Sequence, residues 1–219
     1  MAEYGWLDYI LNPTPLSQKQ KAIISAAVGL FSEKGYAATS TKEIAVRAGA
    51  AEGTIFKQFP TKKDLMLWLT ARIINNALFP LVSVRITELL KKPFGSAEEF
   101  LAALFTNLME SMREGIPLFK IVIQEMPFEP KIRAMLVTQI KKLPLKDVAE
   151  KLRALDRGTE QIKFSEGDII RILITCIAGF FVLRNIVAPE LFADVRPKKD
   201  LAAFIKFISR GITGSVESI

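Results

Sequence analysis

A short segment near the N-terminus carries polar side chains at the spacing of one helical face. Thr54, Lys57 and Gln58 fall on one side of a predicted helix, and the apolar Ile55 and Phe59 fall on the other side. Hydroxyl, ammonium and amide groups on an exposed helix can hydrogen-bond to base edges and phosphates. This pattern indicates a helix that packs through one face and contacts a polar partner through the other.

The elements that must position this face are also readable in the sequence. Apolar spacing predicts one short helix over Thr41–Ala48 and a second over Gly53–Phe59, which Pro60 ends. Gly49 lies between them and can adopt the positive φ that ends a helix. Two short helices joined by a tight turn form the outline of a helix-turn-helix, whose second helix can lie in the major groove of DNA.

The remainder of the sequence predicts an all-α chain. Hydroxyl residues followed three positions later by an acid or amide recur along it, which is the pattern of capping boxes. They are Ser17/Gln20, Ser40/Glu43, Thr61/Asp64, Ser96/Glu99 and Ser165/Asp168. The other predicted helices are Gln18–Lys34, one from Thr61 to just before Pro80, Leu81–Lys92, Ala97–Arg113, Pro117–Met126, Lys131–Lys142, Leu145–Leu155, Glu166–Ala188 and Lys198–Gly211.

Composition excludes several classes of function. The chain of 219 residues has one cysteine, Cys176, and no histidine, which excludes disulfides within the chain, Cys/His zinc sites and histidine-based catalysis. No nucleophile–base pair, phosphate loop or metal cluster is visible, so we expect no enzyme activity, no metal and no cofactor. The net charge of +7 is spread along the chain and does not by itself indicate DNA binding.

The sequence also indicates where the protein acts. The first residues lack the basic start and apolar run of a signal peptide. The most apolar stretch, from Ile169 to Val187, is interrupted by Arg171, Arg184 and Asn185. We therefore expect a cytoplasmic protein that does not span a membrane, with this stretch as a buried helix or a subunit interface.

The N-terminal segment resembles the DNA-binding domain of the tetracycline-repressor (TetR) family. The similarity covers residues 18–69, about a quarter of the chain, and combines residue types with spacing. It rests on Ile24, Ala27, Leu30, Phe31, Gly35, Tyr36, Thr39, Thr41, Glu43-Ile44-Ala45, Ala48-Gly49, Glu52 to Phe56, Phe59 and Lys62 to Leu65. The resemblance implies a three-helix DNA-binding domain packed on a larger helical domain for ligand binding and dimerisation. We place the boundary between residues 1–64, which include an aromatic N-terminal arm, and residues 65–219.

The resemblance also implies which residues meet DNA. The positions that correspond are Thr41, Lys42, Gly53, Thr54, Phe56, Lys57, Gln58 and Lys62. The family usually has tyrosine where this chain has Phe56, so a phenol contact to phosphate is absent. It often has a polar residue where this chain has Ala51, so a helix cap is absent.

The resemblance further implies a homodimeric repressor that a small lipophilic molecule releases from a palindromic operator. The resemblance implies dimerisation through the last two long helices, Glu166–Ala188 and Lys198–Gly211. The middle helices are expected to enclose a lipophilic effector, although aromatic and methionine side chains at helical spacing also fill ordinary cores. The candidate lining residues are Trp68, Phe105, Met109, Met112, Phe119, Ile123 and Phe180. Activation in place of repression, and a ligand-binding protein whose helix-turn-helix no longer binds DNA, are the alternatives.

Overall fold

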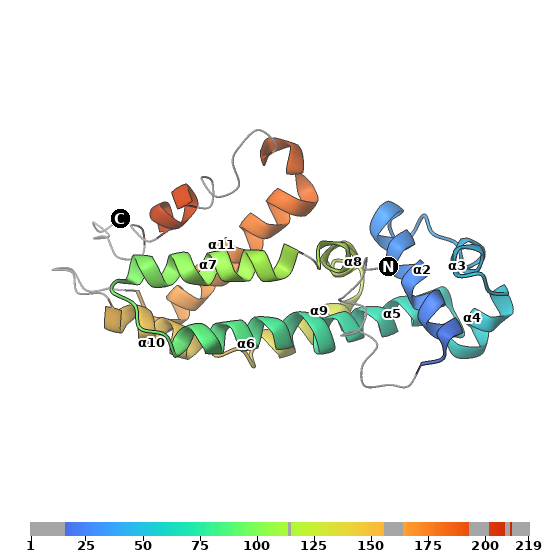
Figure 1. Cartoon of the computed structure of the whole chain (residues 1–219), viewed down its shortest axis with the longest axis horizontal. Helices are drawn as coiled ribbons and strands as arrows, with labels where there is room; N and C mark the ends of the chain where they lie inside the picture. Colours follow the sequence, from blue (N-terminus) through green and yellow to red (C-terminus); the bar gives the residue numbers. More distant parts are fainter. Residues whose placement is uncertain (1–15, 114, 156–163, 193–201, 209–210, 212–219) are drawn as a thin grey trace. The chain divides into compact units, whose positions relative to one another are not determined.

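The computed structural model describes residues 16–113, 115–155, 164–192, 202–208 and 211, and these residues contain helices and no strands (Figure 1). The helices are α2 (Gln18–Lys34), α3 (Thr41–Ala48), α4 (Glu52–Gln58), α5 (Lys62–Arg72), α6 (Phe79–Leu90), α7 (Ala97–Arg113), α8 (Ile116–Glu125), α9 (Pro130–Ile140), α10 (Leu145–Leu155) and α11 (Glu166–Val182). Two π-helical turns, η1 (Ile73–Leu78) and η2 (Leu183–Val187), and a 3-10 turn, η3 (Pro189–Phe192), complete them. The predicted all-α class is confirmed. The predicted aromatic arm and part of the predicted helix Lys198–Gly211 lie outside the described residues.

The side chains at the helix N-termini explain why the boundaries follow the sequence closely. Reciprocal capping boxes form at Ser17, Ser40, Thr61 and Ser165, each with the residue three positions later. At Ser96 the hydroxyl accepts the Glu99 backbone N–H at 3.1 Å. These contacts satisfy backbone donors that a helix leaves unpaired in its first turn.

The prediction that Pro80 separates two helices is wrong. A single helical stretch runs from Lys62 to Leu90 and includes Pro80. A proline in an α-helix removes one hydrogen bond and crowds the carbonyl four residues earlier. The π-helical turn η1 immediately precedes it, and the Phe79 N–H bonds to the Ile74 carbonyl, five residues back. This wider turn gives the proline ring room, so the helix continues.

The chain divides into two compact units, and the first comprises residues 1–81 and 114–142. In this unit α2 packs on α3 and α8, α3 packs on α4, and α5 packs on α8 and α9. The core consists of fully buried aliphatic and aromatic side chains, among them Ile24, Phe31, Ile44, Ile55 and Leu65. This arrangement fixes α3 and α4 on a scaffold made by α2, α5 and α8.

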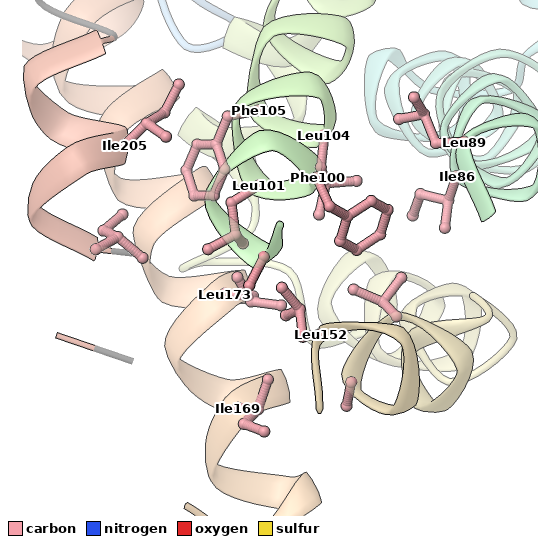
Figure 2. Packing of buried hydrophobic residues seen from close by; sticks show 14 of the residues in the cluster. Ile86, Leu89, Phe100, Leu101, Leu104, Phe105, Leu152, Ile169, Leu173 and Ile205 are labelled. Carbon is pink, nitrogen blue, oxygen red and sulfur yellow. The ribbon is translucent and has the colours of Figure 1, made fainter. Parts of the chain in front are cut away.

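The second unit comprises residues 82–113 and 143–219. Its core brings together one face each of α6, α7, α10 and α11, and Figure 2 shows the side chains that point toward one another there. Phe100, Leu101 and Phe105 from α7 are fully buried in it. Ile205 and Ile208, from the helical residues 202–208, extend the core.

Two helices are long and apolar enough to cross a membrane by length and composition, a test that core helices of soluble proteins also pass. They are Lys62–Leu90 and Glu166–Val187. In the second, 17% of the most apolar window is buried within the chain, against 44% in the first. The helix Glu166–Val187 therefore keeps much apolar surface that its own chain does not cover.

Candidate nucleic-acid interface

The helix-turn-helix is assembled from α3 and α4 as the sequence predicts. Ile44 on α3 and Ile55 on α4 are completely buried, and Phe59, which directly follows α4, is nearly so. Gly49 ends α3 in the left-handed conformation, with φ of 61°, and its N–H bonds to the carbonyls of Ala45 and Val46. The turn thus orients α4 through its buried face and leaves the opposite face uncovered.

The uncovered face of α4 carries the polar residues singled out above. Gly53 and Lys57 are exposed, Thr54 and Gln58 are half-buried, and 43% of Phe56 is exposed. A Cβ atom at Gly53 would meet no protein atom within 4 Å, so internal packing does not require glycine there. A glycine in a helix is destabilising by about 1 kcal/mol relative to alanine. The packing of the protein therefore gives no reason for a glycine at this position.

A hydrogen bond between Thr41 and Glu52 connects the first turn of α3 with the first turn of α4. The Thr41 hydroxyl donates to a Glu52 carboxylate oxygen at 2.5 Å, and both residues are half-buried. Ala51, at the N-cap of α4, makes no side-chain cap, as expected from its methyl group. Lys42, beside Thr41, is exposed. Glu52 was not among the site residues predicted from the sequence, although its position in the first turn of a helix without a side-chain cap was an available signal.

Lys62 has a structural role that the sequence reasoning did not anticipate. Its ammonium group donates to the Tyr36 carbonyl at 2.9 Å and to the Thr39 carbonyl at 2.8 Å. It also lies 4.3 Å from the centre of the Tyr36 ring, within the range of a cation–π contact. An ammonium has three N–H donors, so two are used within the protein. Lys62 therefore holds the loop between α2 and α3.

Ion pairs brace the outer side of α3. Arg47 forms two hydrogen bonds of 2.7 Å to the carboxylate of Glu33 on α2, and this contact lowers the pKa of Glu33. Lys34 pairs with Glu43, which also accepts the Ser40 N–H in the capping box. These hydrogen bonds, Lys34 first, lower the pKa of Glu43 to about 2. The carboxylates near α3 are therefore largely engaged by cations and caps.

A polar cluster connects the start of α5 with the end of α8. Lys63 pairs with Glu129, which precedes α9. Burial raises the pKa of the neighbouring Glu125, and the charge of Glu129 raises it further. Burial is also the main cause of the raised pKa of Tyr36. Charged groups of α5, α8 and the α8–α9 turn thus interact within the first unit.

The predicted effector residues fall into both units. Trp68, Phe119 and Ile123 belong to the first unit, where Trp68 meets Phe59 edge to face. The other four belong to the second unit. There Phe204 contacts Phe105 at a ring-centre distance of 5.7 Å and stacks on Phe180 at 4.6 Å. Met109 and Met112 follow Phe105 on the same face of α7.

The second unit also has an open groove of about 720 Å³, which contains none of the predicted effector residues. It is lined by Thr87, Leu90, Pro93, Phe94, Pro144, Asp147, Glu150, Lys151, Ala154 and Leu155. Lys151 donates to the carbonyls of Leu90 and Lys92 at 2.7 Å each, which closes one end of the α6–α7 turn. Within the described part of the chain, no three His, Cys, Asp or Glu side chains group in a way that could hold a metal.

Comparisons with known proteins find similar sequences over the N-terminal segment and, at lower identity, over most of the chain. The sequence profile of "Bacterial regulatory proteins, tetR family" matches residues 23–68. YvkB of Bacillus subtilis, an HTH-type transcriptional regulator, is 26% identical over 196 residues, which are 86% of this chain and 96% of YvkB. RutR of Escherichia coli, also an HTH-type transcriptional regulator, is 36% identical over 70 residues, 32% of this chain and 33% of RutR.

A solved structure shows the same fold over nearly the full length. The fatty acid degradation regulator FadR from Bacillus halodurans superposes with a TM-score of 0.62 at 21% identity, over 94% of this chain and all of that one. The matched helix-turn-helix is the segment whose α4 face is polar and uncovered, and the full-length relatives are regulators. Residues 23–68 therefore match the DNA-binding segment of the TetR family of bacterial regulatory proteins, and the similarity to transcriptional regulators over most of the chain supports a DNA-binding transcriptional regulator.

Proposed function

We propose that the protein is a repressor in the cytoplasm that binds a palindromic operator as a homodimer and leaves it when a small lipophilic effector binds. The observation that carries this proposal is the α4 face: Ile55 is buried beneath it while Gly53 and Lys57 are exposed on it. Thr54 and Lys57 are proposed to contact base edges and Lys42 and Thr41 to contact phosphates. Gly53, Phe56 and Gln58 complete the surface, and Lys62 positions the loop behind it.

The test is binding of the purified protein to its own upstream DNA, with random duplex as competitor and across a salt series. Lys57→Ala and Thr54→Ala are the test variants. Lys120→Ala, on α8, serves as the charge-matched control. We expect salt-sensitive, sequence-selective binding that the first two variants weaken and the control preserves. Equal affinity for upstream and random duplex would contradict operator recognition.

The dimer is proposed to form through the last helices. Leu183, Val187 and Leu191 are 47%, 63% and 71% exposed, and Phe207 is 77% exposed. Exposed apolar side chains gathered on one segment are typical of subunit interfaces. A twofold dimer would place its two recognition helices about 34 Å apart, one turn of DNA. Light scattering should give twice the chain mass for the wild type and a smaller mass for Val187→Lys.

The effector site is proposed to lie in the second unit, beside Phe105, Met109, Met112 and Phe180. Its apolar character favours a lipophilic compound, and release follows if the ligand binds better to a state unsuited to the operator. The fluorescent probe 1-anilinonaphthalene-8-sulfonate should bind the wild type, and Met109→Glu should weaken this binding. Unchanged probe binding by Met109→Glu would place the site elsewhere.

A further inference from the structure

Glu52 presents a carboxylate at the start of α4, inside the proposed DNA-binding surface. It is the first residue of that helix, and its oxygen accepts the Thr41 hydroxyl at 2.5 Å. No ion pair to Glu52 occurs within 4.0 Å among the residues that the structure describes. Glu33 and Glu43, the other acids near α3, pair with Arg47 and Lys34. Glu52 therefore differs from these two acids in having no cation within ion-pair distance among the described residues.

This contact has a direct consequence for Thr41. A hydroxyl has a single proton to donate, so a hydroxyl that donates to Glu52 has none left for a phosphate. A phosphate approaching Thr41 must also approach the carboxylate, and two negative charges repel each other. Both effects oppose the phosphate contact that Thr41 is proposed to make.

We propose that Glu52 is an internal competitor for the phosphate contact of Thr41 and thereby lowers the sequence-independent part of DNA affinity. Phosphate contacts supply most non-specific binding, whereas base contacts supply specificity. A carboxylate at this position weakens non-specific binding to phosphates and leaves the base contacts proposed for Thr54 and Lys57 in place. Glu52 is thus a specificity-determining residue of the recognition surface. The inference rests on the DNA-binding function proposed above.

The experiment measures fluorescence anisotropy of a labelled random duplex of about 30 bp, roughly three helical turns, over a sodium chloride series. The variants are Glu52→Gln, which removes the charge and keeps an acceptor, and Glu52→Ala, which removes both. Glu98→Gln removes the same charge from the first turn of α7 and is the matched control. Thermal unfolding of every variant verifies that it is folded.

We expect both Glu52 variants to bind random duplex about threefold more tightly than the wild type at low salt, as expected for one unit of charge at several ångströms in water. The gain should shrink as salt rises, because salt screens the repulsion. Glu98→Gln should change affinity little. Affinities of both Glu52 variants no higher than that of Glu98→Gln would overturn the proposal.

Thr41→Val, made in two backgrounds, tests the competition itself. In the wild type it should cost little affinity, because Glu52 already occupies the hydroxyl. In Glu52→Ala it should cost clearly more, because the hydroxyl is then available to phosphate. Equal costs in both backgrounds would also overturn the proposal. If the wild type and all variants fail to bind duplex at low salt, both this inference and the proposed DNA-binding function are wrong. If the wild type binds duplex but the Glu52 variants bind no more tightly, only the role proposed for Glu52 is wrong.

Discussion

Both units have an apolar core, but the regions proposed to bind DNA and effector are fixed within their own units by different kinds of contact. Around α3 and α4, directional hydrogen bonds fix the chain: Thr41 to Glu52, Lys62 to two loop carbonyls, and Arg47 to Glu33. In the second unit, the shared core of α6, α7, α10 and α11 is aliphatic and aromatic (Figure 2). Directional contacts specify geometry at a surface, whereas apolar packing is non-directional and tolerates rearrangement.

This difference suits the two tasks proposed for the protein. A surface that matches DNA must hold its groups within a fraction of an ångström. A domain that accommodates an effector must change shape at modest cost. We therefore expect that shortening a core side chain in the second unit lowers stability through lost packing. Substitution of a polar side chain in the first unit should change stability through lost hydrogen bonds and, for the carboxylates, in a way that depends on pH.

The largest effect is expected from a cavity in the second unit. Phe100 is completely buried in its core, so Phe100→Ala should lower the free energy of unfolding by about 3–5 kcal/mol. Urea unfolding at fixed protein concentration measures this loss. Phe128→Ala, where the side chain is 78% exposed, is the control and should change stability by less than about 0.5 kcal/mol. An equally small change for Phe100→Ala would contradict the claim that apolar packing stabilises the second unit.

Lys62→Ala tests whether polar contacts stabilise the loop between α2 and α3 in the first unit. Loss of its two carbonyl contacts and the Tyr36 ring contact should lower the free energy of unfolding by about 2 kcal/mol. Lys57→Ala, at an exposed position, should leave stability unchanged within about 0.5 kcal/mol and weaken DNA binding instead. Unchanged stability of Lys62→Ala, together with a shallower salt dependence of DNA binding, would assign Lys62 to a phosphate.

Features that depend on residues close together in the sequence were predicted correctly, whereas contacts between residues far apart in the sequence were not. Capping boxes and the Gly49 turn are decided within a few residues, and they were predicted correctly. Lys62 was singled out, yet its partners lie 23 and 26 residues earlier, and only the folded loop brings them together. The Thr41–Glu52 contact spans eleven residues and was missed for the same reason.

The prediction at Pro80 failed because the backbone just before it widens into a π-helical turn. Pro80 normally ends a helix, but the π-helical turn before it lets the helix run on to Leu90. The effector residues stay a prediction, because apolar side chains at helical spacing have the same pattern in a core and in a pocket. Phe105 illustrates this, since it is fully buried in the core of the second unit.

Two carboxylates of the first unit, Glu43 and Glu125, should affect stability in opposite ways as the pH changes, because their pKa values are shifted in opposite directions. The folded-state pKa of Glu43 is lowered from 4.5 to about 2 by Lys34 and Ser40. A lowered pKa stabilises the fold above the unfolded value and loses that contribution as pH falls toward 2. Glu43→Gln should therefore have a lower melting temperature than the wild type above pH 4.5, by less than Lys62→Ala. The difference should vanish toward pH 2, and a difference independent of pH would contradict this origin.

Glu125 should show the opposite sign and the smallest effect. Burial, and then the charge of Glu129, raise its pKa, while Lys62 acts in the other direction. An acid whose pKa is raised on folding is more easily protonated in the folded state, so the wild type loses stability as pH rises through that value. Glu125→Gln removes this penalty and should melt slightly higher than the wild type at neutral pH, with the gain fading toward pH 4.5 and below. A lower melting temperature for Glu125→Gln at neutral pH would show that Glu125, like Glu43, stabilises the first unit as a charged group, and the contrast between them would be lost.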